Sequence, residues 1–201
     1  MQRICHPEQS EGSLIIKMFH YVQHDKCLAF ERMKSIKLIQ NKMKKLPYFE
    51  DVDWNSPEDY YEAELKYQNH DMTIDLNLDD DPEGTWAEDY TRFIQKLDEY
   101  YNNIRKVIKG YIPDKGGMVD EFFTFHFEEI PDEMQEVYNK TDANLPEDER
   151  KLQMLKLNRI GFYFAENNFA TWDFSFGDFT DEILVIITDK KGEIIDITWE
   201  S

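Results

Sequence analysis

Two segments in the first half of the chain alternate between apolar and polar residues. From Tyr60 to Tyr67, tyrosine, alanine and leucine take every second position, and glutamate and lysine stand between them. The alternation resumes from Met72 to Asp79, after a short polar segment. Two period-2 runs joined by a polar turn are typical of a β-hairpin with one face in water. The pattern therefore predicts a hairpin over residues 60–79.

A longer segment has apolar residues at steps of three and four. These residues run from Trp86 to Ile108 and form the single stripe of an amphipathic helix. Thr85 and Glu88 have the spacing of a capping box, and Gly110 is typical of a helix end. We therefore predict one helix from residue 85 to residue 109.

The segment from Val119 to Ile130 fits two kinds of structure, because its phenylalanine spacing suits either a helix or a strand. We favour a helix, since Asp120 and Glu121 suit a first turn and Pro131 ends the segment. One or two further helical turns are expected over residues 132–138. A short helix is expected to begin at residue 146, a proline.

The last third of the chain predicts a meander of strands. Residues 157–165 and 170–176 form two strand-like runs, residues 182–188 are continuously apolar, and an alternating run ends at Trp199 after a turn at Gly192. Strands, then helices, then strands indicate an α+β fold. We predict an antiparallel sheet, made of the N-terminal hairpin and the C-terminal meander, with two or more helices between them packed on one face.

Composition changes this picture mainly through charge. The 201 residues carry a net charge of −19, with 23 Lys and Arg against 42 Asp and Glu. Residues 1–46 have a net charge of +5, so residues 47–201 have a net charge of −24. Such a surface repels nucleic-acid phosphates and anionic lipid, so we expect neither nucleic acid nor a membrane as partner. It favours a basic protein as partner, or it serves solubility alone.

The first 42 residues differ from the rest, and both cysteines of the chain, Cys5 and Cys27, lie among them. We expect residues 1–42 to be an N-terminal extension from a misassigned start, with Met33 or Met43 as the true one; a basic arm is the alternative. Residues 43–201 are expected to form a single acidic α+β domain. A domain without cysteine needs no oxidising compartment, so a cytoplasmic location is expected.

Motifs that carry chemistry are weak throughout the sequence. Asp75, Asn77 and Asp79 have the spacing that opens a calcium loop, but Asp80 stands where that loop needs glycine. His126 has no second histidine at ligand spacing, so we interpret it as structural and expect its removal to change stability little. Nucleophile and nucleotide-binding motifs are also missing. We therefore predict no catalytic, cofactor-binding or metal-binding residues.

Several short motifs together resemble one protein family. They are Leu46-Pro47-Tyr48-Phe49, Tyr60-Tyr61-Glu62, Asp75-Leu76-Asn77, Leu157-Asn158-Arg159-Ile160-Gly161, Asp173-Phe174-Ser175 and Thr198-Trp199-Glu200-Ser201. Over residues 43–201 the chain resembles an uncharacterised bacterial family of small acidic α+β proteins, known only as a domain of unknown function. The resemblance implies the fold and brings no activity or cofactor. Similar small acidic proteins are common among immunity proteins that neutralise bacterial toxins.

Three functions remain open from the sequence. The first hypothesis is a non-catalytic protein-binding module, in particular an immunity-type inhibitor of a basic toxin. The alternatives are an enzyme with a carboxylate-based site and a housekeeping structural protein. We predict a partner-binding patch on the wet face of the hairpin and the loop after it, where carboxylates would attract a basic partner. Its residues are Glu62, Glu64, Asp75, Asn77, Asp79, Asp80 and Asp81.

Overall fold

The alternating segments form the predicted hairpin. Strand β1 (Tyr60–Tyr67) pairs antiparallel with strand β2 (His70–Asn77) in an unbroken register. Gln68 and Asn69 make the turn, with φ angles of 49° and 67°. Positive φ at both turn positions matches the right-handed twist of the two strands. The hairpin prediction is confirmed.

The computed structural model describes residues 45–50, 52–53, 57–78, 84–164 and 167–201. The chain divides into two units, Met1–Lys44 and Lys45–Ser201, and the described residues belong to the second. The expected extension over residues 1–42 and its alternative start sites therefore lie outside the described residues. No helix in the described part of the chain is long and apolar enough to cross a membrane.

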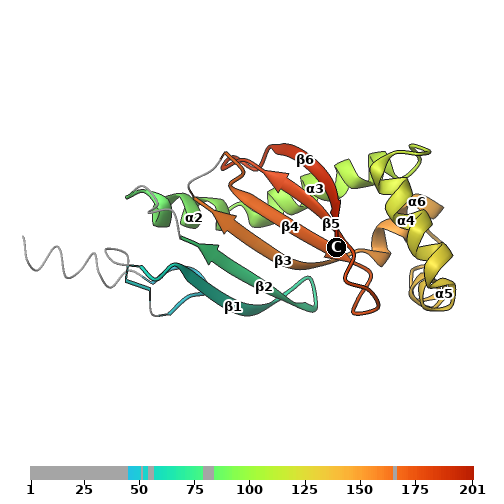
Figure 1. The fold of residues 1–201 in the computed structure, drawn as a ribbon, viewed down its shortest axis with the longest axis horizontal. Coiled ribbons are helices and arrows are strands. Elements are labelled where there is room, and N and C mark those ends of the chain that lie inside the picture. Colours follow the sequence, from blue (N-terminus) through green and yellow to red (C-terminus); the bar gives the residue numbers. More distant parts are fainter. Residues whose placement is uncertain (1–44, 51, 54–56, 79–83, 165–166) are drawn as a thin grey trace, which may run out of the picture. The chain divides into compact units, whose positions relative to one another are not determined.

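In the described part of the chain, six strands form one sheet in which neighbours in sequence are neighbours in space (Figure 1). After the hairpin come β3 (Lys156–Tyr163), β4 (Ala170–Ser175), β5 (Ile183–Thr188) and β6 (Ile194–Glu200). β2 and β3 run parallel, and all other neighbours are antiparallel. The α+β class is confirmed, but the sheet is mixed where we expected it to be antiparallel throughout. A parallel pair forms because the helices between β2 and β3 carry the chain back along the sheet.

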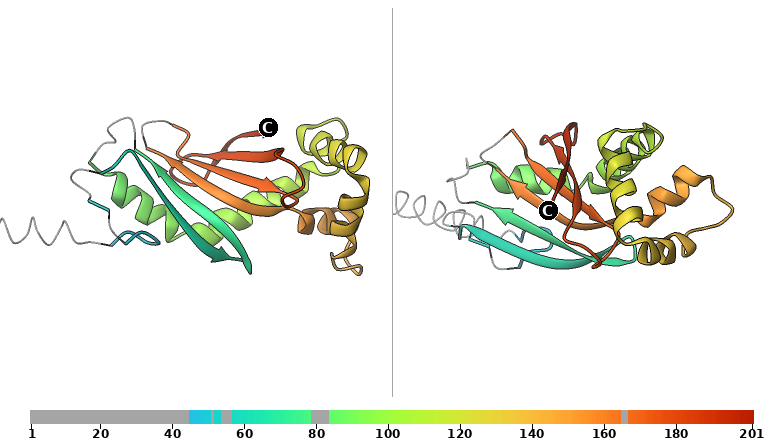
Figure 2. Two further views of the ribbon diagram at one scale, coloured as in Figure 1. Left: turned by 60° about the horizontal axis from the view of Figure 1, so that its bottom comes forward. Right: turned by 45° about the vertical axis from the view of Figure 1, so that its right-hand side comes forward.

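Five helices lie between β2 and β3 in the described residues. They are α2 (Trp86–Ile94), α3 (Leu97–Tyr111), α4 (Met118–Glu129), α5 (Pro131–Asn139) and α6 (Glu147–Met154). The helix expected over residues 119–130 is confirmed as α4, and the two short helices are confirmed as α5 and α6. α2 and α3 lie against one face of the sheet, and the other three lie beyond one end of the strands (Figures 1 and 2).

The long amphipathic segment forms two helices, so our prediction of one helix was wrong. Gln95 and Lys96 make a turn between α2 and α3. The apolar positions keep their helical spacing across the turn because Leu97 follows Phe93 by four residues. The periodicity therefore gives no sign of the turn.

The predicted capping box at the start of α2 is also absent. Thr85 has φ −101° and ψ 0°, and its side chain makes no capping hydrogen bond. Its hydroxyl donates instead to Oδ2 of Asp89 at 3.3 Å. An N-cap residue usually has extended backbone angles, and the helical backbone of Thr85 turns its side chain away from the amides of the first turn.

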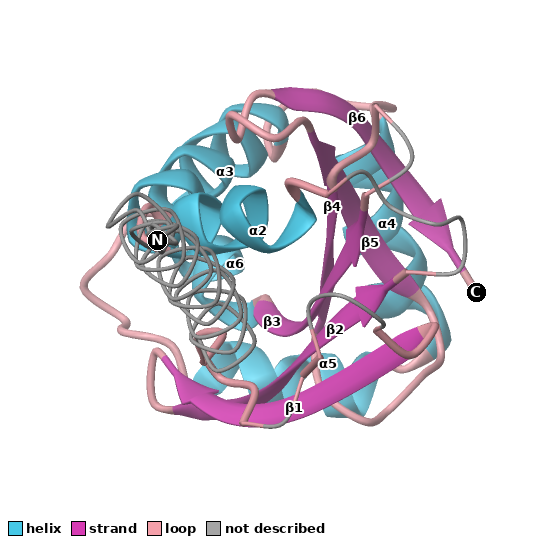
Figure 3. Cartoon of the chain, turned by 90° about the vertical axis from the view of Figure 1, so that its left-hand side faces the viewer, coloured by secondary structure: helices cyan, strands magenta, loops and turns pink. Residues whose placement is uncertain are grey.

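The apolar face of the sheet and the stripes of α2 and α3 form the core, and the sheet curves around both helices (Figure 3). Trp172 of β4 is fully buried, with its ring centroid 5.9 Å from that of Phe93. Gly192 turns the chain before β6 with φ 77°, and a Cβ there would lie 2.2 Å from the ring of Tyr100.

The side of the sheet opposite α2 and α3 is the polar face. Its charged residues are Glu62, Glu64, Lys66, Asp71, Asp75, Lys156, Arg159, Asp173, Asp196 and Glu200.

Candidate functional site

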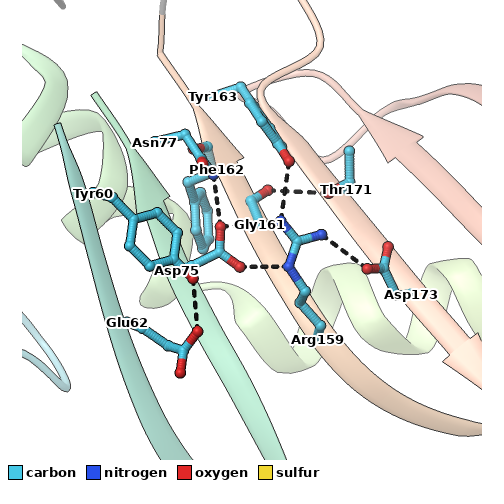
Figure 4. Close-up of polar contacts among 10 residues, drawn as sticks. All are labelled: Tyr60, Glu62, Asp75, Asn77, Arg159, Gly161, Phe162, Tyr163, Thr171 and Asp173. Carbon is cyan, nitrogen blue, oxygen red and sulfur yellow. Dashed lines mark hydrogen bonds and ion pairs between the residues drawn. The ribbon is translucent and has the colours of Figure 1, made fainter. Parts of the chain in front are cut away.

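A cluster of charged side chains lies on three adjacent strands of the polar face. Arg159 of β3 lies between Asp75 of β2 and Asp173 of β4 (Figure 4). Successive side chains of a strand point to opposite faces, so apolar neighbours in the core force these three onto the polar face together. The register then places Asp173 opposite Arg159, and Asp75 opposite Gly161 two positions further along β3.

The guanidinium of Arg159 is bound on several sides. Its Nε donates to Asp75 Oδ2 at 2.5 Å, and its Nη2 donates to Asp75 Oδ1 at 3.1 Å. Nη1 donates to Asp173 Oδ2 at 2.9 Å, and Nη2 also donates to the Tyr163 hydroxyl at 3.0 Å. A two-pronged contact between arginine and a carboxylate fixes direction as well as distance. Arg159 therefore ties β2, β3 and β4 together through their side chains.

Gly161 makes room for this guanidinium. A Cβ at Gly161 would lie 2.5 Å from Arg159 Nη2 and 3.0 Å from Thr171 Oγ1. Glycine inside a strand is typical of places where another group approaches the backbone closely. An alanine at this position would push Nη2 away from the two oxygens to which it donates.

Burial controls the ionisation of the cluster. Asp75 is fully buried and Asp173 is 6% exposed, while 33% of the Arg159 side chain remains exposed. Burial raises the pKa of Asp173 above its usual range, and the hydrogen bond from Arg159 offsets only part of this effect. Burial alone would lower the pKa of Arg159, but its hydrogen bonds to Asp75, Tyr163 and Asp173 raise that pKa by more. The guanidinium therefore stays charged.

In the structure, the residues of the partner-binding patch that we predicted on the hairpin differ in exposure: those of β1 are exposed, and those of β2 are buried or half-buried. Glu62 and Glu64 are exposed on β1. Asp75 is buried against Arg159, and the half-buried Asn77 donates from Nδ2 to Asp75 Oδ1 at 2.6 Å. The side chains of Asp75 and Asn77 thus form hydrogen bonds within the protein and are not available to a partner. Among the described residues of the predicted patch, only Glu62 and Glu64 are exposed, so the prediction of a continuous exposed patch is corrected to these two residues. The remaining three predicted residues, Asp79, Asp80 and Asp81, lie outside the described residues.

Sequence reasoning missed Arg159 and Asp173, which complete the cluster. A signal is present in residues 157–162, where an asparagine and an arginine interrupt a run of apolar residues and a glycine follows the arginine two positions later. An arginine in a central strand needs a partner that satisfies its charge, and a strand glycine indicates a close approach. Together these two features predict a guanidinium that lies flat on the sheet.

His126 of α4 is buried and engaged at both ring nitrogens. The histidine is 1% exposed, its Nδ1 donates to the Phe122 carbonyl at 2.7 Å, and its Nε2 lies 3.1 Å from Thr180 Oγ1. These contacts support the structural interpretation of this residue. They also lead us to revise the expectation that its removal changes stability little, because loss of the buried ring, which packs against Phe122 and Phe176, leaves a cavity. Within the described residues, no group of three or more His, Cys, Asp or Glu side chains is placed to hold a metal ion.

We expect His126 to make folding stability depend on pH below neutrality. Burial lowers the pKa of His126 in the folded protein, and its bond to Phe122 and the nearby Glu182 offset only part of this. The neutral ring therefore stabilises the fold fully above the unfolded-state pKa of about 6.5, and this stability is lost as the pH falls. Urea unfolding at about pH 7.5 and about pH 5.5 should show a loss up to about 1.4 kcal/mol larger for the wild type than for His126→Gln. Parallel losses would contradict this expectation.

The ion pairs of Arg159 with Asp75 and Asp173 link three strands of the sheet. Because the positive charge of Arg159 is paired with these two aspartates, the exposed carboxylates determine the charge of the surrounding surface. Comparisons of the chain with protein-family models, with curated proteins and with solved structures find no match. The fold and the polar face are therefore the features from which a function can be inferred.

Proposed function

We propose that this protein is a non-catalytic binding module of the bacterial cytoplasm that takes up a basic partner protein on the polar face of its sheet. An immunity-type inhibitor of a basic toxin is the kind of module that we favour. The membership of residues 43–201 in the acidic domain-of-unknown-function family belongs to the same proposal.

The proposal rests on one observation, the excess of exposed carboxylates on the polar face. Among the described residues, these are Glu62, Glu64, Asp71, Asp196 and Glu200. The exposed cations of this face in the described residues are Lys66 and Lys156, and Lys66 already lies 3.9 Å from a carboxylate oxygen of Asp71. Arg159 is occupied by two aspartates. A basic partner gains both attraction and a faster association rate from such a surface.

The position of Glu62 within this surface is fixed by its neighbour. The hydroxyl of Tyr60 donates to Glu62 Oε2 at 2.6 Å, and this bond to a carboxylate raises the pKa of Tyr60 to about 12. Tyr60 itself is about half exposed, at 48%. An exposed tyrosine beside a held carboxylate offers a partner a ring to pack against and a charge to contact.

The enzyme alternative lacks comparable support. A catalytic carboxylic acid needs an apolar pocket that keeps it protonated near neutral pH. The three buried carboxylates of the described residues are bound by cations instead: Asp75 and Asp173 by Arg159, and Asp120 by Lys115 at 2.7 Å. Each has a partner that explains its burial.

Reversing the charges on β1 tests the proposed function. The full-length protein should retain a basic protein from the source cytoplasm at low salt and release it at high salt, because salt screens exposed charges. The variant Glu62→Lys/Glu64→Lys should retain at least about tenfold less of that protein. Quantitative mass spectrometry of the retained fraction makes the measurement.

The matched control is Glu128→Lys/Glu129→Lys, which makes the same change in net charge at the exposed end of α4. Positive charge suits the C-terminal end of a helix, so this variant should fold normally. It should retain the partner at the wild-type level. Equal loss in both variants would show that net charge alone governs binding, and equal retention would show that β1 takes no part; either result refutes the proposed surface.

A further inference from the structure

A groove runs beside the edge of the sheet that is farthest from β1. β6 is the last strand in the strand order, so its outer edge pairs with no other strand in the described residues. The end of α3, the start of α4 and β6 together line the groove, and Tyr111, Met118 and Ile195 are among the lining residues. The groove has a volume of about 470 Å³.

The walls of this groove expose apolar side chains. Tyr111 is 47% exposed, Met118 is 43% exposed and Ile195 is 49% exposed. Six large apolar side chains are exposed in the described residues, and these are three of them. Scattered exposed apolar residues are normal on a protein surface, but a group that converges on one groove is typical of an interaction site.

Two charged residues line the groove, and both are acidic. They are Asp114, just before α4, and Asp196 of β6, and no basic residue is among the described residues that line the groove. A second copy of this chain would bring the same carboxylates against the groove, and like charges placed opposite each other on paired strands are unfavourable. The lining therefore favours a partner that carries lysine or arginine.

The backbone of β6 carries a related feature. The N–H of Ile197 donates to Oδ1 of Asp196, the preceding residue, at 2.9 Å. An incoming strand can supply a carbonyl for this N–H, provided that a cation binds the carboxylate that is released. The edge of β6 is thus protected against strands in general and suited to a strand with basic side chains.

From these features we propose that the groove beside β6 binds an extended segment of a basic partner protein. Its apolar side chains enter the groove between Tyr111, Met118 and Ile195, and its lysine or arginine side chains contact Asp114 and Asp196. Its backbone pairs with the outer edge of β6 and adds a strand to the sheet. This site lies at the opposite edge of the sheet from Glu62 and Glu64, so it goes beyond the function proposed above.

A fluorescent peptide with the sequence Lys-Val-Lys-Ile-Lys-Val-Lys, blocked at both ends, tests the proposal by fluorescence anisotropy. The full-length protein should bind it at least about tenfold more tightly than the same peptide methylated on alternate backbone nitrogens. Methylation preserves the charge of the peptide and removes its strand pairing. The variant Tyr111→Ala/Ile195→Ala, which preserves the charge of the protein, should weaken binding by a similar factor.

Two controls distinguish binding in this groove from binding elsewhere on the protein. Phe179→Ala removes another exposed large apolar side chain, 44% exposed, and should bind the peptide like the wild type. Glu62→Lys/Glu64→Lys should keep the difference between the two peptides, so binding in the groove is tested separately from binding at Glu62 and Glu64. Absence of binding, equal binding of the two peptides, or wild-type binding by Tyr111→Ala/Ile195→Ala would overturn the proposal. A dimer of the wild type that the same double variant abolishes would also overturn it, because the occupant would then be a second copy.

Discussion

Replacing Arg159 with methionine is expected to lower the free energy of unfolding by about 3 kcal/mol. Methionine keeps part of the packing of the arginine stem, but it leaves two buried carboxylates, Asp75 and Asp173, without a cation. Removing one partner of a buried ion pair typically costs about 3–5 kcal/mol, and the partial exposure of Arg159 places the expected loss at the lower end. Urea unfolding followed by tryptophan fluorescence measures the difference.

Two further variants show whether burial of unpaired charge causes this loss. Arg159→Met/Asp75→Asn/Asp173→Asn removes the charges together and should be more stable than Arg159→Met alone. Lys66→Met breaks only the exposed pair with Asp71, so it should change stability by less than about 0.5 kcal/mol. If Arg159→Met costs no more than Lys66→Met, the cluster does not hold the strands together.

Replacing Trp172 with alanine is expected to cost about 4 kcal/mol of folding stability. The ring is fully buried at the centre of the sheet, it packs on Phe93, and its Nε1 donates to the Thr188 hydroxyl at 3.1 Å. Alanine leaves a cavity that the surrounding strands and helix cannot close completely. Thermal or urea unfolding provides the measurement.

Trp172→Phe is the matched control for this prediction. Phenylalanine keeps a large apolar ring and loses the hydrogen bond to Thr188, so it should cost clearly less than alanine. A loss for alanine that is no larger than the loss for phenylalanine would mean that the ring contributes little packing. The arrangement of the core around Trp172 would then be wrong.

The elements that could be predicted are those whose signals are local. The alternation in β1 and β2 indicates directly which side chains face the core, and Asp120, Glu121 and Pro131 mark the ends of α4 by their effect on helix termini. The break at Gln95 and Lys96 leaves the helical period unchanged, so no periodicity argument finds it. The parallel pairing of β2 with β3 depends on the path of five helices, which local patterns do not encode.

The candidate site shows the same division. The outward direction of Glu62 and Glu64 follows from the alternation of β1 alone. The burial of Asp75 does not follow from β2, because it depends on Arg159, which is 84 residues away in sequence. An aspartate on the wet face of a hairpin becomes buried once a central strand brings a guanidinium against it. The groove beside β6 likewise depends on three separate elements that only the fold brings together.

Carboxylate footprinting by mass spectrometry, on the full-length protein alone and with the partner retained at low salt, tests most directly whether the polar face binds that partner. This method labels exposed Asp and Glu side chains, and labelling falls where a partner covers them. We expect Glu62 and Glu64 to lose labelling in the complex, while Glu128 and Glu129 at the end of α4 keep theirs. Unchanged labelling of Glu62 and Glu64, with protection at Glu128 and Glu129, would contradict the polar face as the binding surface.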